Sequence, residues 1–391
     1  MDPLECTVMP YAWGSRTAIA SLTGRKTPSA GPEAELWMGA HPVAPSLVER
    51  DGARVSLADV VARAPERELG EEVVRELGPR LPFLLKVLAA AEPLSLQAHP
   101  TMARARAGFE DEERRGISID DKRRNYKDPH HKPELLSALT PFAALSGFRQ
   151  IDQTLRLFDL LAVVELEAVL KPLRASPDAR GLAETFRALM TMPADLREQT
   201  VGATLAACAR PAAAFQRERA MATRLASLYP GDIGIVSALF LELVHLEPGQ
   251  AIYLGAGNLH AYLEGTGIEI MASSDNVLRG GLTQKHVDVP ELLRVLDFDA
   301  GPARVLVPRA IDEHESVYDT PAREFRLSRL AVKGHLVRAV HGPEILLATE
   351  GSIKAGPLAL APGASAFVPA ASERYTLSGE GTVYRATTHL R

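Results

Sequence analysis

The chain has 391 residues, 46% of them hydrophobic, so it can build more than one buried core. Its net charge is −5 with acids and bases intermixed, which argues against a dedicated nucleic-acid binder, because such domains carry a basic excess. No stretch approaches about 18 uncharged apolar residues, so no membrane span is expected. Only Cys6 and Cys208 are present, and residues 1–5 lack the features of a signal peptide. We therefore expect a cytoplasmic protein.

The first 150 residues mix strand-like and helical patterns. Residues 1–60 alternate short apolar runs with turn residues, and the apolar run at 84–91 predicts a buried strand or a short helix. Residues 56–78 and 101–117 carry apolar residues at helical spacing, which predicts two amphipathic helices. The charged stretch at 120–124 is expected to be a solvated loop.

From residue 151 the composition shifts towards Ala, Leu and Arg. Apolar residues recur at the helical period up to about residue 228, and the prolines interrupt this pattern several times. These features predict an all-α insertion over residues 151–232. The β pattern then returns at residues 246–254, which are typical of strand, Pro-Gly turn and strand.

A similar segment recurs near the C-terminus, at residues 360–369. Aligning the two Pro-Gly pairs gives an offset of 114 residues, which matches Leu263 with Leu377. We interpret this as a weak internal repeat of a cupin-like jelly roll, a fold that encloses small-ligand cavities; chance similarity of two turns is the alternative. His260 falls on Arg374 in this alignment, so the second barrel is expected to hold no metal.

The segment at residues 93–100 offers two metal-ligand side chains. Gln97 and His99 are two residues apart, so on an extended segment they point to the same face. Ordinary hydrogen bonds of a buried Gln and His are the simpler alternative for this pair alone. Two later stretches add a carboxylate, Glu134, and a second imidazole, His260. Together these nitrogen and oxygen ligands suit a divalent metal.

These three stretches, with residues 271–283, resemble the signature segments of type I mannose-6-phosphate isomerase (phosphomannose isomerase), a family of zinc enzymes. The last stretch contains Ser-Asp-Asn-x-x-Arg-x-Gly-Leu-Thr from Ser274 to Thr283. Four dispersed motifs in the right order are far more specific than any one of them, and the resemblance runs over most of the chain. The chain departs from the family pattern at His130, where Asn is common, and after Thr283, where Pro is common.

The resemblance and the repeat together imply a mainly β fold with an α-helical insertion: two cupin-like jelly-roll barrels plus an all-α domain. The expected division has four parts: a first part of the catalytic β domain at 1–150, the insertion at 151–232, a second catalytic part at 233–300, and a metal-free β domain at 301–391. The resemblance further implies one Zn²⁺ per chain. Its expected ligands are Gln97, His99, Glu134 and His260.

The comparison also implies roles for residues beside the ligands. Catalytic roles fall on Arg279 and Asp275, and Lys132 and His131 are further catalytic candidates because they precede the expected ligand Glu134 in the sequence. Contacts with the sugar or its phosphate fall on Trp13, Lys86, Ser95, Tyr262, Glu269 and Lys285. For Trp13, a core aromatic near a turn is the alternative. No glycine-rich phosphate loop is present, so the phosphate anchor is expected to be a cluster of side chains.

The general base is left open between two residues. Lys132 shares a face with Glu134 if the segment is extended, and an amine close to a metal cation loses its proton more readily. His131 is the alternative base, and a salt bridge on the pocket rim is the simpler explanation of Lys132. Abstraction of a proton beside a carbonyl also needs positive charge near the resulting enediolate, which zinc can supply.

The resemblance implies interconversion of mannose 6-phosphate and fructose 6-phosphate by proton transfer between C1 and C2. An isomerase of a different aldose is one alternative. A non-haem iron oxygenase is another, because two histidines and a carboxylate on a cupin barrel also suit that class. A non-catalytic sugar-binding cupin is a third. The expected partner is a small sugar phosphate, without nucleic acid or membrane, and a monomer is expected.

Overall fold

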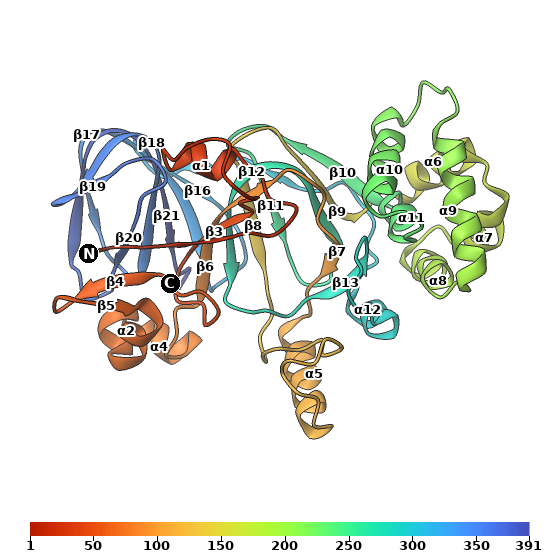
Figure 1. Cartoon of the computed structure of the whole chain (residues 1–391). Helices are drawn as coiled ribbons and strands as arrows, with labels where there is room; N and C mark the ends of the chain where they lie inside the picture. The colour runs from red at the N-terminus through yellow and green to blue at the C-terminus, as the bar shows by residue number, and fades with distance from the viewer. Residues whose placement is uncertain (391) are drawn as a thin grey trace.

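The structure, a computed structural model, describes residues 1–390 and contains two β units and a group of helices (Figure 1). The first β unit is an 11-stranded sheet whose main path runs β14-β11-β8-β12-β6-β3-β2. Its strands are β2 (Thr7–Met9), β3 (Glu35–Met38), β6 (Phe83–Ala90), β7 (Leu96–Ala98), β8 (Glu134–Ala138), β9 (Phe142–Phe148), β10 (Leu241–Leu246), β11 (Ala251–Leu254), β12 (His260–Ala272), β13 (Leu278–Gly281) and β14 (Val305–Leu306).

The second β unit is an eight-stranded sheet with the path β1-β20-β18-β21-β17-β16-β15. Its strands are β1 (Asp2–Pro3), β15 (Arg309–Ala310), β16 (Glu315–Tyr318), β17 (Arg326–Ala339), β18 (Glu344–Ala355), β19 (Leu358–Leu360), β20 (Ser365–Val368) and β21 (Arg374–Thr387). A separate ribbon pairs β4 (Leu47–Arg50) with β5 (Ala53–Ser56). The mainly β class with two cupin-like units is therefore confirmed.

The two sheets repeat at the predicted offset. Strand β11 begins at Ala251 and β20 at Ser365, while β12 begins at His260 and β21 at Arg374, so both pairs are 114 residues apart. Strand β11 pairs with β8 and β12 pairs with β8, just as β20 and β21 both pair with β18. The similarity of the two Pro-Gly turns thus reflects a repeated strand arrangement.

The N-terminal strand belongs to the C-terminal sheet, and the chain then passes into the first β unit. Strand β1 pairs with β20 of the C-terminal sheet, whereas the predicted division assigned residues 1–150 to the first β domain. Pro3 suits this place, because a proline lacks the N–H that a central strand must donate and is tolerated at an edge. One buried core also spans both units, with Leu36 and Val87 from the first and Ile345 and Phe367 from the second.

Helices fill the interval between β9 and β10 and lie at the far end of the molecule from the C-terminal sheet (Figure 1). They are α6 (Ile151–Leu161), the 3₁₀ helix η1 (Val164–Leu166), α7 (Glu167–Ala175), α8 (Ala179–Met190), α9 (Ala194–Cys208), α10 (Gln216–Leu228) and α11 (Gly234–Ala238). The helical run thus starts at the predicted residue and continues six residues past 232. Within residues 1–390, every helix is too short or too polar to cross a membrane.

The remaining helices lie outside this interval of the chain. They are α1 (Ala18–Leu22), α2 (Leu57–Arg63), α3 (Pro65–Leu69), α4 (Glu71–Leu77), α5 (Met102–Arg114) and α12 (Val289–Val295). The single helix predicted over 56–78 is wrong, because three short helices occupy that range. Pro65 begins α3, and Gly70 has a positive φ of 89° that ends it. Helix α5 matches the prediction and is capped by Thr101, whose side chain accepts from the Arg104 N–H.

Candidate metal centre and substrate pocket

Three buried side chains converge at the end of the first barrel. His99 Nε2 lies 3.4 Å from Glu134 Oε1, and His260 Nε2 lies 3.5 Å from Glu134 Oε2. One ligand atom from each residue lies within 4.8 Å of the others, and all three residues are buried. Two imidazole nitrogens and a carboxylate around one point form a common donor set for a divalent metal.

Sheet register brings these residues together from distant parts of the chain. Glu134 opens β8 and pairs with Met271 of β12, and His260 opens β12 opposite Gln97 of β7. Gln97 also pairs with Arg279 of β13. The fourth predicted ligand therefore lies one strand away from His260, and it lines the adjacent cavity. Its role as a ligand remains a prediction.

The protonation of the two histidines fits a metal. His99 Nδ1 lies 2.7 Å from the main-chain oxygen of Asn276, and His260 Nδ1 lies 3.0 Å from that of Asn258. A carbonyl oxygen only accepts, so each Nδ1 carries the hydrogen and each Nε2 presents its lone pair to the centre. His99 Nε2 is buried without a hydrogen-bond partner in the described residues, which leaves it free to ligate.

The pKa shifts of His99 and Glu134 favour the protonation states that a metal ligand needs. Burial lowers the pKa of His99, so its imidazole stays neutral as a ligand must. Burial by itself raises the pKa of Glu134, but His99, Lys132 and His260 outweigh it and hold that pKa well below the ordinary value. The cluster therefore presents a neutral imidazole at His99 and a carboxylate at Glu134.

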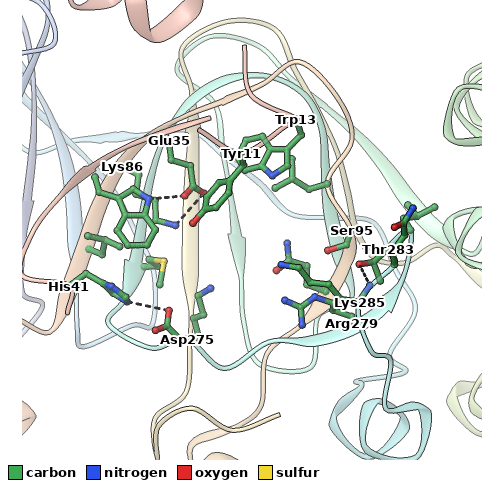
Figure 2. Close-up of a pocket in the computed structure, with 18 of the residues that line it drawn as sticks. Tyr11, Trp13, Glu35, His41, Lys86, Ser95, Asp275, Arg279, Thr283 and Lys285 are labelled. Carbon is green, nitrogen blue, oxygen red and sulfur yellow. Dashed lines mark hydrogen bonds and ion pairs between the residues drawn. The ribbon is translucent and has the colours of Figure 1, made fainter. Parts of the chain in front are cut away.

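A cavity of about 470 Å³ opens beside the cluster (Figure 2). Figure 2 shows two groups of polar side chains on opposite sides of it, with Glu35, Lys86, His41 and Asp275 on one side and Ser95, Arg279, Thr283 and Lys285 on the other. Tyr11 and Trp13 stack at 5.8 Å between their ring centroids and form part of the wall, and the contact of Trp13 with a sugar remains a prediction.

Lys86 is the centre of a buried ion-pair network. Its Nζ lies 2.9 Å from Glu269 Oε2 and 3.5 Å from Glu35 Oε1. Burial by itself lowers the pKa of Lys86, but Glu269, Glu35 and Glu134 outweigh it and raise that pKa above its ordinary value. Lys86 is therefore a charged donor on the cavity wall.

Two predicted substrate contacts lie behind this wall rather than on it. Glu269 and Tyr262 are buried, and the Tyr262 hydroxyl donates to Glu269 Oε1 at 2.9 Å. Neither is among the described residues that line the cavity. Because Glu269 faces Lys86, the structure gives both residues a supporting position, and the expected direct contact with the sugar has no geometric basis here.

The two candidate bases point in opposite directions. Lys132 lines the cavity, and its Nζ lies 3.3 Å from Glu134 Oε1. His131 instead points to the C-terminal β unit, where its Nε2 lies 2.6 Å from Glu324 Oε1. Neighbouring residues of an extended segment face opposite sides, so only one of the two can face the cavity. The structure therefore corrects the placement of His131 in the catalytic group.

Asp275 has a partner that the sequence did not reveal. His41 Nε2 lies 3.2 Å from Asp275 Oδ1, and both side chains line the cavity. His41 Nδ1 accepts from the Val43 N–H, so its hydrogen lies on Nε2 and points to the carboxylate. Glu35, another residue that the sequence did not reveal, accepts from Trp37 Nε1 at 2.7 Å. The only available signal was the position of these polar residues within or just after an apolar segment.

Arg279 and Lys285 form the opposite, cationic side of the cavity. Within residues 1–390 neither has a carboxylate at ion-pair distance. Burial lowers the pKa of Arg279, and burial together with the charge of Arg279 lowers the pKa of Lys285. Two cations that lack a counter-charge form a suitable site for an anionic ligand group.

The fold and this site define a metal-centred protein of the cupin type with a pocket for an anionic ligand. The profile of the family described as Phosphomannose isomerase type I, catalytic domain matches residues 1–151. The mannose-6-phosphate isomerase of Escherichia coli (strain K12) is 40% identical to the chain over 399 residues, with 100% of each protein covered. The chain therefore belongs to the type I phosphomannose isomerase family of enzymes.

More distant relatives and solved structures support the same family assignment. The mannose-6-phosphate isomerase of Homo sapiens is 33% identical over 382 residues, which cover 90% of this chain and 88% of the human protein. The crystal structure of a phosphomannose isomerase mutant from Salmonella typhimurium superposes with a TM-score of 0.93 at 37% identity, covering 100% of both chains. A zinc-bound mannose 6-phosphate isomerase has a TM-score of 0.91 at 37% identity, covering 100% of this chain and 99% of the other.

Proposed function

We propose that this protein interconverts mannose 6-phosphate and fructose 6-phosphate. The observation that carries the proposal is that Lys132 contacts Glu134 of the buried cluster and also lines the cavity whose far side holds Arg279 and Lys285. A metal centre, an amine and an anion site thus share one pocket. The names of the family members support this choice of sugar phosphate.

Zinc is the metal that we propose, held by His99, Glu134 and His260 with Gln97 as a further ligand. Two histidines and a carboxylate are common zinc donors, and the zinc-bound relative supports the choice. When bound, zinc supplies positive charge near the oxygens on which the enediolate charge develops.

The chain's own residues would then bind the substrate, stabilise the developing charge and transfer protons. Lys285 and Ser95 hold the phosphate at the cationic side of the cavity, where a dianion offsets the unpaired charges. Arg279, which pairs across strands with Gln97, donates to the charge that develops at C1 and C2. Lys132 takes a proton from one of these carbons and returns it to the other. Asp275 moves protons at the sugar hydroxyls.

The test measures bound metal and turnover together. We expect about one zinc per chain, and fructose 6-phosphate formed from mannose 6-phosphate only while the metal is present. Zinc without this turnover would point to another aldose. Iron with oxygen uptake would favour a non-haem oxygenase, which has no evident need for Lys132 and Arg279, and would overturn the isomerase proposal.

We further propose that the protein acts in the cytoplasm as a monomer. Cys6 and Cys208 are both free, which is consistent with a reducing compartment. Light scattering of the purified protein would test the oligomeric state, and a mass of twice the chain would contradict it.

A further inference from the structure

Asn276 is fully buried, and its side chain is hydrogen-bonded to the main chain of residues 127–130. These hydrogen bonds form a clasp between the two segments. Its Oδ1 accepts from the Lys127 N–H at 2.7 Å and the Asp128 N–H at 3.3 Å. Its Nδ2 donates to the carbonyl oxygens of Asp128 at 2.7 Å and His130 at 2.8 Å. The carboxamide therefore uses both of its acceptor sites and both of its donor hydrogens on one short segment.

The main chain of the same residue contacts the metal cluster. The Asn276 carbonyl oxygen receives the hydrogen of His99 Nδ1 at 2.7 Å, and this contact directs His99 Nε2 to Glu134. The clasped segment continues directly into Lys132 and Glu134. One residue thus fixes the position of a ligand imidazole from one side and the segment that carries the ligand carboxylate from the other.

Neighbouring contacts tie Asp275 to the same clasp. The Ser274 hydroxyl donates to Asp128 Oδ2 at 3.1 Å and to the His130 carbonyl at 3.2 Å. The Asp275 N–H donates to Asp128 Oδ2 at 2.8 Å. The clasp therefore also holds the residue that faces His41 in the cavity.

We propose that Asn276 is a positioning residue that sets the relative placement of His99, Glu134 and Lys132, and thereby the zinc affinity and the turnover of the site. The inference rests on the proposed zinc-dependent isomerase. Partners of ligand residues tune metal sites because they fix ring orientation and tautomer, and their loss costs about 10–100-fold in metal affinity or activity. Asn276 differs from an ordinary such partner because it reaches two ligand-bearing segments at once.

The test compares Asn276→Ala with the unaltered protein. The substitution keeps the carbonyl that meets His99 but removes the carboxamide partners of the Lys127 and Asp128 N–H groups and of the Asp128 and His130 carbonyls. We expect zinc affinity, measured by chelator competition, to fall about 10–100-fold. With Co²⁺ in place of zinc, the visible absorption spectrum should change, because it reports ligand geometry. The loss of kcat should exceed the change in KM.

The matched control is Thr185→Val in α8, where a buried hydroxyl accepts from the Leu173 N–H at 3.1 Å far from the site in sequence. It should lower the unfolding midpoint and leave zinc affinity and the Co²⁺ spectrum unchanged. An Asn276→Ala protein that behaves like this control would overturn the proposal. If Asn276→Ala does not fold, Ser274→Ala makes the decision: weaker zinc binding supports the clasp, and unchanged binding overturns it.

These results are separable from the proposed function. If the unaltered protein binds no zinc, the proposed function fails, whatever the variants do. If it binds zinc and turns over substrate while Asn276→Ala matches it in affinity and spectrum, only the inference about Asn276 fails.

Discussion

Arg279 lines the cavity without a carboxylate partner in the described residues, so its charge is available to a ligand. Arg279→Ala should keep the zinc and lose mainly kcat, because the guanidinium would act on charge that develops during the reaction. We expect a fall of about 10²–10³-fold in kcat, as for other donors to a developing oxyanion. Steady-state kinetics with metal quantification measure both. An intact kcat in Arg279→Ala would rule out the assigned role.

His260→Ala, by contrast, should lose metal and activity together.

The His41–Asp275 pair predicts a pH effect. Burial by itself raises the pKa of Asp275, but the hydrogen bond from His41 and the charges of Lys132 and Lys86 outweigh it and hold that pKa below the ordinary value of 3.8. His41→Leu removes the hydrogen bond, so the pKa of Asp275 should rise. Because Asp275 is proposed to act as a carboxylate, activity should then be lost at a higher pH on acidification.

The profile of kcat/KM against pH measures this shift. The exposed His335 offers a control, since His335→Leu removes an imidazole far from the cavity lining and should leave the acidic limb in place. An acidic limb in His41→Leu that coincides with that of the control would show that Asp275 does not depend on His41.

At the scale of elements, the long strands of the two β units contain glycines of positive φ at equivalent positions. Gly265 in β12 has φ +127° and Gly379 in β21 has φ +112°, and the two are 114 residues apart. A Cβ on Gly379 would lie 2.1 Å from the Ser352 carbonyl oxygen. A side chain there meets both an unfavourable φ and the neighbouring strand, so the repeat preserves a backbone requirement.

Gly379→Ala should therefore lower the free energy of unfolding by about 2–4 kcal/mol, because strain and overpacking add. Gly356 is a matched control: its φ is +57°, but a Cβ on it would have no other atom within 4 Å. Gly356→Ala should lose only about 1–2 kcal/mol. Urea unfolding measures both, and equal losses would contradict the role of the close strand contact.

At the scale of the whole molecule, the C-terminal β unit supports the segment that carries Glu134. His131 and Glu324 join the two at 2.6 Å, and a shared core lies beneath them. Burial by itself raises the pKa of Glu324, but the hydrogen bond and charge of His131 outweigh it and lower that pKa below the ordinary value of 4.5. The carboxylate form is thus more stable in the folded protein than in the unfolded chain.

The sign of the pH dependence follows. A lowered pKa contributes stability that is present above about pH 4.5 and is lost as pH falls through the folded pKa. Glu324→Gln keeps a neutral acceptor, so we expect it to cost about 0.5–1.5 kcal/mol at pH 7. That difference should shrink as pH falls below about 4.5 towards the lower folded pKa, at which the native Glu324 takes up its proton.

Urea unfolding of both proteins between pH 7 and pH 4 measures the difference. Glu313→Gln, at a residue 85% exposed, is the control and should match the native protein throughout. If the difference in free energy of unfolding between Glu324→Gln and the native protein stays constant with pH, the charge of Glu324 does not contribute to stability.

Much of the fold could be predicted because it depends on local patterns. The Pro-Gly turns gave the 114-residue offset, and the Ala- and Leu-rich period gave the start of the helices at Ile151. Boundaries inside such patterns were less predictable: Pro65 and Gly70 divide one expected helix into three, because the proline ring fixes φ and removes an N–H, and Gly70 adopts a positive φ that other residues disfavour.

By itself, the sequence predicted the class of the fold through its family resemblance, its internal repeat, and a set of expected metal ligands that includes His99, Glu134 and His260. These depend on residue type, spacing and motif order. Only the tertiary structure decided that His131 turns to Glu324, that Glu269 and Tyr262 stand behind Lys86, and that His41 meets Asp275. The physical reason is that the direction of a side chain depends on sheet register and on partners, and these partners lie up to 234 residues away along the chain.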